Sequence, residues 1–167
     1  MPMALFDGET EAGWHLETDP ASTAAVDIGR TLTGFELRVR YGLAGDPTGS
    51  PWAALVWGTP IGQPPVNVAH YDRLTFTGRA NRPMRISVQI RTLDAGRTLR
   101  RWQRSVYLDT VDGEHTIDFN DLVPSADTET PTPALAEVTQ LLFVVDTTNT
   151  KPGTAGRFWI RSAAFRR

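Results

Sequence analysis

An alternation of apolar and polar residues with a period of two runs through most of this chain of 167 residues. In residues 83–91 the even-numbered positions are Met, Ile, Val and Ile, and the odd-numbered positions between them are Arg, Ser and Gln. Successive side chains of a strand point to opposite faces, so this segment predicts a strand with one buried and one open face. Strands of that kind form antiparallel sheets.

The same pattern recurs along the chain, and clusters of Gly, Pro, Asn and Asp separate its occurrences. We expect strands at residues 34–43, 73–77, 83–91, 101–108, 115–119, 141–145 and 156–165, with weaker candidates at 14–17, 21–28 and 52–57. The segment 141–145 is apolar on both faces, which is typical of a strand in the middle of a covered sheet. Helical periodicity is nearly absent, and residues 133–142 are expected to form at most one short turn. The sequence therefore predicts an all-β fold, an antiparallel sandwich or barrel.

The length and composition fit one globular domain that spans residues 1–167. The net charge of −2 gives no overall attraction to nucleic acid or to anionic lipid. The absence of cysteine excludes disulfides, thiolate zinc sites and a cysteine nucleophile. No apolar run reaches the roughly 20 residues of a membrane helix, and the first residues lack the features of a signal peptide. We expect the chain to be a domain of a longer protein.

The sequence contains none of the motifs that identify common catalytic sites. His15, His70 and His115 show no metal-ligand spacing, and neither a Gly-x-Ser-x-Gly elbow nor a Gly-rich phosphate loop occurs. Carboxylates gather between residues 109 and 121 around a predicted turn, where they either bond to the local backbone or bind a cation. We therefore predict no catalytic residues and a protein that is not an enzyme.

Several segments in this order resemble a known family. They are Tyr71–Phe76 (YDRLTF), Met84–Ile90 (MRISVQI), His115–Leu122 (HTIDFNDL), and the pair Leu141–Val145 and Gly156–Ile160. The succession is similar to that of the jelly-roll carbohydrate-binding modules of the galactose-binding-domain-like group, of the family 11 kind, and of the related CIA30-type domains. The resemblance covers about residues 5–165. It implies a jelly-roll sandwich with an extracytoplasmic location.

The resemblance also implies a structural calcium ion, held by an acidic residue near the N-terminus and another on the closing strand. Asp7 stands where the first ligand would be, but Arg161 occupies the closing position. The chain departs from the family pattern at this point, so we predict no metal site and no cofactor.

The candidate ligand-binding residues come mostly from the polar faces of the predicted strands. If neighbouring strands pair as the resemblance implies, one side of the central sheet carries Arg38, Arg40, Arg85, Gln89, Arg91, Gln103 and Tyr107. The planar donor groups of Arg and Gln suit paired hydrogen bonds to hydroxyls or carboxylates, and a Tyr ring can stack on a sugar. The alternative is an exposed face whose charges maintain solubility and deter edge pairing.

Tryptophans are numerous, and each either fills the core or offers a stacking platform. We expect Trp14 and Trp159 in the core, because both lie near chain ends that pack together in this fold. Trp52 and Trp57 fall on opposite faces of one strand. Trp57 and Trp102 complete the predicted ligand-binding set, Trp102 because the neighbouring arginines would allow an exposed cation–π arrangement.

Residues 97–104 are basic and include one aromatic residue, which is typical of a strand that tracks a phosphate backbone or of a solvated hairpin end. With an acidic chain overall, we expect no nucleic acid partner and no membrane insertion. The leading hypothesis is a non-catalytic carbohydrate-binding module that captures a glycan on a polar concave sheet. The alternative is a structural or protein-interaction β-sandwich of a larger envelope or sensory protein, whose arginines would face an adjacent domain.

Overall fold

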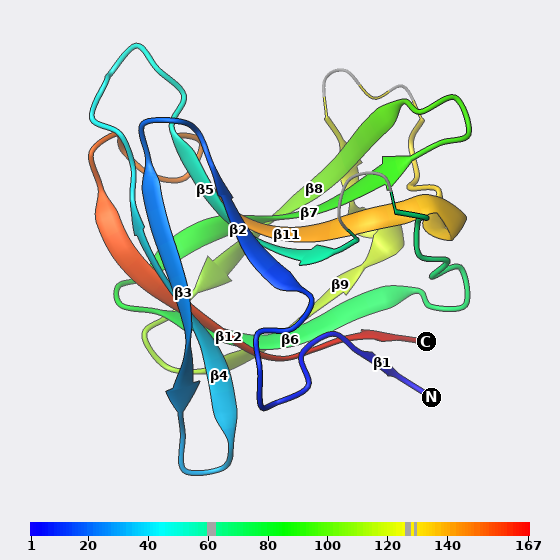
Figure 1. Cartoon of the computed structure of the whole chain (residues 1–167), viewed down its shortest axis with the longest axis horizontal. Coiled ribbons are helices and arrows are strands. Elements are labelled where there is room, and N and C mark those ends of the chain that lie inside the picture. Colours follow the sequence, from blue (N-terminus) through cyan, green and yellow to red (C-terminus); the bar gives the residue numbers. More distant parts are fainter. Residues whose placement is uncertain (60–62, 126–127, 129) are drawn as a thin grey trace.

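The computed structural model describes residues 1–59, 63–125, 128 and 130–167, which form two antiparallel sheets packed face to face (Figure 1). Sheet A contains β1 (Met3–Ala4), β3 (Thr23–Arg30), β4 (Phe35–Gly42), β6 (Arg73–Ala80), β9 (Gly113–Asp118) and β12 (Ala155–Arg166). Its order is β3-β4-β12-β6-β9, and β1 pairs with β12. Sheet B contains β2 (Trp14–Thr18), β5 (Trp52–Gly58), β7 (Met84–Leu93), β8 (Leu99–Leu108), β10 (Val123–Pro124) and β11 (Val138–Asp146). Its order is β10-β8-β7-β11-β5-β2.

These layers confirm the predicted all-β sandwich of the jelly-roll kind, and all ten predicted strands are present within a few residues of their expected bounds. The expected short turn before β11 is the 3₁₀ turn η2 (Leu135–Glu137), and a second one, η1 (Phe119–Asp121), follows β9. As predicted for a two-sided apolar segment, β11 lies inside sheet B between β7 and β5.

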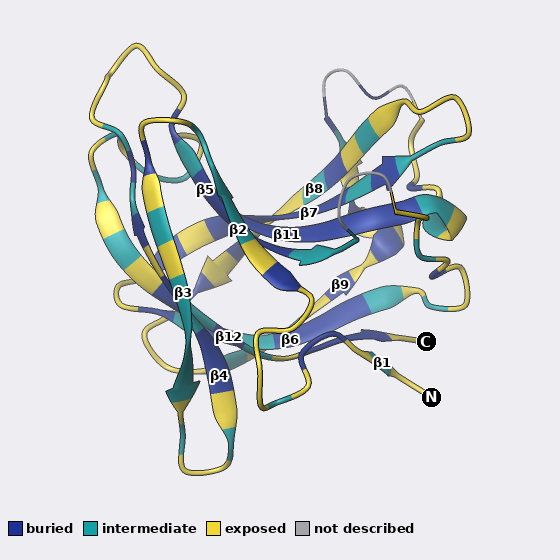
Figure 2. Cartoon of the chain, viewed as in Figure 1, coloured by how far each residue is buried: buried dark blue, intermediate teal, exposed yellow. Residues whose placement is uncertain are grey.

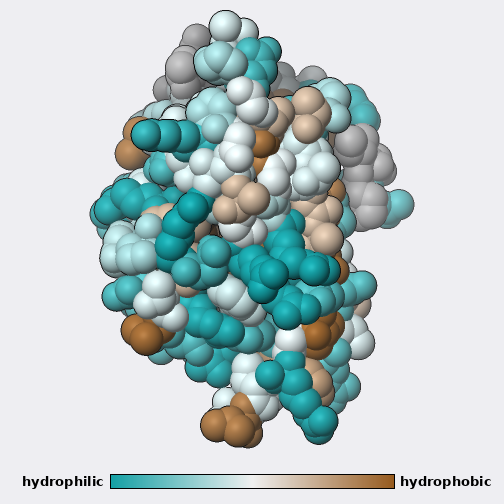
Figure 3. All heavy atoms as spheres, turned by 90° about the vertical axis from the view of Figure 1, so that its left-hand side faces the viewer, coloured by the Kyte–Doolittle hydropathy of each residue, from teal (hydrophilic) through white to brown (hydrophobic). Residues whose placement is uncertain are grey.

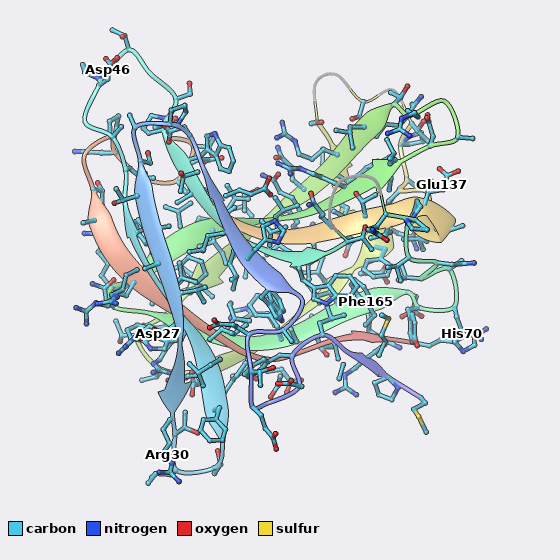
Figure 4. The ribbon with its side chains drawn as sticks, viewed as in Figure 1. Asp27, Arg30, Asp46, His70, Glu137 and Phe165 are labelled. Atoms are coloured by element: carbon cyan, nitrogen blue, oxygen red, sulfur yellow. The ribbon has the colours of Figure 1, made fainter. Side chains whose placement is uncertain are left out.

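The hydrophobic core lies between the two sheets, where the inward faces of both are buried (Figure 2). Phe143 of sheet B packs against Phe76 of sheet A, with ring centroids 5.0 Å apart, and against Trp14 at 6.1 Å. Phe165 also points between the layers, where its ring meets those of Trp57 and Phe119 (Figure 4). The prediction that Trp14 belongs to the core is confirmed.

The closing strand β12 determines the place of another tryptophan. Phe158 and Ile160 fill the inward positions of β12 and are fully buried. Because neighbouring residues of a strand face opposite sides, Trp159 lies on the outer face of sheet A, and its predicted place in the core is wrong. The guanidinium of Arg79 covers this ring, with Cζ 4.4 Å from its centroid. A bulge between Arg161 and Ala164 then shifts the register of β12 against β6.

The outer face of sheet A is polar and carries a network of ion pairs. Arg79 donates two hydrogen bonds to the buried carboxylate of Glu36, at 2.6 and 2.7 Å, and contacts Asp112 at 3.0 Å. Arg161 pairs with the other oxygen of Asp112 at 3.0 Å. The side of the molecule that carries β3 is mostly hydrophilic (Figure 3). These charged groups of the outer face are therefore largely paired with one another.

Candidate functional site

A groove of about 340 Å³ opens on the outer face of sheet B, the face turned away from the core. Its lining comes from β5, β7, β8 and β11 and from the loops that precede β5 and follow β11. The lining residues are Ser50, Trp52, Gln89, Arg91, Arg101, Leu142, Val144, Asp146, Thr147 and Thr148. In Figure 1 the strands of sheet B rise on both sides of β11, whose residues Leu142 and Val144 line the groove.

The floor of the groove is apolar. Leu142 and Val144 of β11 pack with Ala54 and Val56 of β5 in a small hydrophobic cluster that is separate from the main core, and Trp52 packs against this cluster. The register places Leu142 beside Val56 and Val144 beside Ala54, so the four side chains form one contiguous patch. One apolar face of β11 therefore packs in the main core, and the other forms the cluster beneath the groove.

Polar groups border this floor and are held by hydrogen bonds within the sheet. The buried amide of Gln89 donates to the hydroxyl of Ser87 at 3.1 Å. Arg91 donates from Nη1 to Gln140 at 3.0 Å and to the carboxylate of Glu17 at 3.3 Å. These bonds hold the planar groups of Gln89 and Arg91 in fixed orientations at the border of the groove.

Five of the nine predicted site residues lie on this outer face of sheet B. β7 and β8 pair in register, so Arg85 stands beside Tyr107, and Gln89 stands beside Gln103. Gln89 and Arg91 line the groove, whereas Arg85 and Tyr107 lie at the other end of the same strand pair and are exposed. The strands thus bring these five together, and their role in ligand binding stays a prediction.

The expectation that Arg38 and Arg40 share this face is wrong. Both belong to β4, which pairs with β3 and β12 in sheet A, so they project from the opposite side of the molecule. Arg38 forms a two-point ion pair with Asp27 of β3, and this hydrogen bonding lowers the pKa of Asp27. Alternation predicts that a strand has a polar face, but it carries no information about the sheet to which the strand belongs.

Trp57 and Trp102 also do not lie on the predicted face. Trp57 points inward from β5 and meets Phe165 edge to face, with ring centroids 5.7 Å apart. Trp102 is fully buried, and its indole N–H donates to the backbone carbonyl of Thr130 at 3.0 Å. The neighbouring arginines therefore do not surround an exposed ring, and neither tryptophan is available as a platform on this surface.

The aromatic residue of the groove is Trp52, which the sequence reasoning placed on the opposite face of β5 from Trp57 but did not choose. Arg101 and the apolar floor residues were missed as well. The signal for the floor was present in the sequence, because β11 is apolar on both faces although only one face of a sandwich strand meets the core. In the folded chain this face is already covered, since Leu142 is 0% and Val144 5% exposed, and Trp52 packs against their cluster.

The residues present do not fit the calcium site that the resemblance implies. The carboxylate of Asp7 accepts hydrogen bonds from the backbone N–H groups of Glu9 and Thr10, each 2.7 Å long, and from the Thr10 hydroxyl. These bonds lower the pKa of Asp7. The position expected for a second acid holds Arg161, a cation paired with Asp112. Within the described ranges, no cluster of three His, Cys, Asp or Glu side chains is arranged to hold a metal ion.

The described residues include no helix that is both long and apolar enough to cross a membrane.

Comparison with known proteins identifies the class of fold. No protein-family model and no curated protein matches the chain. Among solved structures, the family 11 carbohydrate-binding module of a cellulosomal cellulase of Clostridium thermocellum superposes with a TM-score of 0.77 at 16% identity, over 99% of this chain and 94% of that one. The same TM-score and identity hold for a Clostridium thermocellum family 11 module in complex with a β-1,3-1,4-mixed-linked tetrasaccharide, over 99% and 95% of the two chains.

A family 30 module of another cellulosomal cellulase of Clostridium thermocellum matches with a TM-score of 0.71 at 12% identity, over 98% of this chain and 96% of that chain. The chain therefore has the β-sandwich fold of family 11 and family 30 carbohydrate-binding modules along nearly its whole length. At these identities the likeness shows the fold, and the ligand must be argued from the groove.

Proposed function

We propose that this chain is a non-catalytic carbohydrate-binding module that captures a glycan chain in the groove over sheet B. The observation that carries the proposal is the composition of that groove, an apolar floor with an aromatic side chain, bordered by preorganised planar amide and guanidinium groups. A pyranose ring has an apolar C–H face and a rim of hydroxyls, so it matches an apolar floor with a polar border. The structural similarity to carbohydrate-binding modules also supports this proposal.

The mechanism is binding alone. One face of a sugar ring would stack against Trp52, which packs on the buried cluster of Leu142 and Val144, while Gln89 and Arg91 would donate hydrogen bonds to its hydroxyls. Because the sheet backbone holds these groups in place, little ordering is needed on binding. The proposal assigns no residue a role in making or breaking a bond.

Isothermal titration calorimetry against a panel of purified polysaccharides tests the proposal, with Trp52→Ala as the variant. We expect binding to at least one glycan, and a loss of about tenfold in affinity for the variant, since an aromatic stacking contact contributes on the order of 1 kcal/mol beyond its buried area. Arg40→Ala, an exposed change on the outer face of sheet A, is the matched control and should leave the affinity unchanged.

Thermal unfolding of each variant shows whether it retains the fold. If the wild-type protein binds no member of the panel, or if Trp52→Ala binds as tightly as wild type while folded, the groove is not a glycan site. The first result favours the alternative of a structural or protein-interaction domain.

A further inference from the structure

Arg91 and Arg101 form a directly opposed pair of cations at one end of the groove. They are register partners on the antiparallel strands β7 and β8, and both line the groove. Like charges in directly opposite positions of a sheet destabilise it. A negative charge bound near these two arginines would therefore stabilise the sheet.

The protein supplies only part of that charge. Arg91 is paired with Glu17 at 3.3 Å, and the adjacent Arg100 is paired with Asp94 at 3.5 Å. Arg101 is exposed, and among the described residues no side chain forms an ion pair or hydrogen bond with its guanidinium. Of the cations that line the groove, Arg101 is thus the one whose guanidinium charge and donors no described side chain uses.

The acid of the groove lies far from this cation. Gln140, the register partner of Arg91, and Asp146 are six residues apart on β11, which corresponds to about 20 Å of strand. The carboxylate of Asp146 also accepts a hydrogen bond from the backbone N–H of Thr148 at 3.0 Å. An anionic group bound at Arg101 would therefore meet little repulsion from Asp146.

We propose that the groove selects an acidic polysaccharide, and that Arg101 binds the carboxylate of a uronic acid residue. This inference rests on the proposed function, because it names the class of glycan that the same groove takes. The planar guanidinium fork matches the two oxygens of a carboxylate. Further sugars along the chain would then reach Trp52, which packs on the buried cluster of Leu142 and Val144.

The charge pattern favours a uronate over a nucleic acid. Binding of a phosphate backbone needs several unpaired cations in a row, because every nucleotide carries a charge. Within the described part of the chain, the groove offers one such cation, close to an aromatic side chain that suits a sugar ring.

The experiment compares acidic and neutral glycans that differ in little else. Polygalacturonate and its fully methyl-esterified form share a backbone, but only the former carries carboxylates. Polymannuronate adds a second uronate, mixed-linked β-glucan a neutral chain, sulfated galactan a different anion and oligo(dT) a nucleic acid. We expect wild-type protein to bind at least one uronate about tenfold or more tightly than the neutral chains at low salt, and to lose that preference as salt rises.

Arg101→Gln should remove the preference for the uronate while changing the affinity for neutral glycans less than twofold. Arg101→Lys should retain part of the preference, since it keeps the charge but loses the fork. Arg40→Gln removes an exposed arginine from the outer face of sheet A and is the matched control.

The outcomes separate this inference from the proposed function. Equal or tighter binding of neutral chains overturns the acidic selectivity and leaves glycan binding intact. A preference for sulfated galactan or for oligo(dT) overturns the assignment of a carboxylate. Selective uronate binding that survives in Arg101→Gln overturns the role of that residue, and the failure of every glycan to bind overturns both proposals.

Discussion

His115 shows how a single residue couples the packing of sheet A to pH. Its ring stacks on the buried ring of Phe76, with centroids 5.0 Å apart and ring planes at 25° to each other. Burial lowers the pKa of His115 because the protonated form loses hydration. The unfolded chain, in which a histidine has a pKa of about 6.5, therefore binds the proton more readily than the folded chain.

The sign of the pH effect follows from this difference. Stability that depends on neutral His115 is fully present above about pH 6.5 and is lost as the pH falls toward the lower folded pKa. We expect the free energy of unfolding to decrease between pH 7.5 and pH 5, and His115→Gln to flatten that dependence. Urea denaturation at several pH values measures it. His70→Gln, a change at an exposed histidine, should keep the wild-type slope, and an unchanged slope in His115→Gln would contradict the assignment.

Gly58 controls the pairing of two whole elements, β5 and β11. It is the register partner of Gln140 and has a φ of +138°, a backbone conformation that favours glycine. A Cβ atom at this position would lie 2.0 Å from the backbone oxygen of Thr139. Since that neighbour is backbone, the clash can be relieved only by moving one strand against the other.

We therefore expect Gly58→Ala to lower the free energy of unfolding by about 2–4 kcal/mol. Gly8→Ala is the matched comparison, because Gly8 also has a positive φ, of +82°, but a Cβ there meets nothing within 4 Å. It should cost only the conformational strain, about 1 kcal/mol. Guanidinium denaturation followed by tryptophan fluorescence measures both. Equal losses in the two variants would show that backbone conformation, and not the contact between strands, sets the cost.

At the scale of the whole molecule, one continuous core joins the two sheets. Aromatic contacts such as Phe76 with Phe143 cross from one layer to the other, so neither sheet keeps its buried face without its partner. We expect the chain to unfold as one cooperative unit. The urea transitions measured by tryptophan fluorescence and by far-ultraviolet circular dichroism should then coincide. Two separated transitions would mean that the layers unfold independently.

A bound glycan should raise this global stability. A ligand present at 100 times its dissociation constant adds about 2.7 kcal/mol to the free energy of unfolding when it binds only the folded chain. The gain should fall to about 1.4 kcal/mol in a folded Trp52→Ala variant at the same glycan concentration, since a tenfold weaker affinity leaves the glycan at about 10 times its dissociation constant.

The fold was predictable from the sequence because its signal is local. A period of two over a few residues identifies a strand, and Gly and Pro clusters identify the turns between strands. The expected segment 83–91 became β7, and the segment 141–145 became the central strand β11. The same alternation correctly gave Gln89 and Gln103 a common face, because they lie on strands joined by one short hairpin.

The site was predictable only in part, because its composition depends on pairings between distant segments. Arg40 and Arg91 have the same local pattern, yet one strand entered sheet A and the other sheet B. The same is true of the tryptophans: Trp102 is buried against Thr130, whereas Trp52 reaches the groove because β5 lies beside β11. The sequence by itself determined the strands, their two-faced character and the class of fold, since side-chain alternation is a property of neighbouring residues. The tertiary structure decided which faces meet, because the contacts that assign a strand to a sheet and a ring to the core or the groove join residues far apart in the chain.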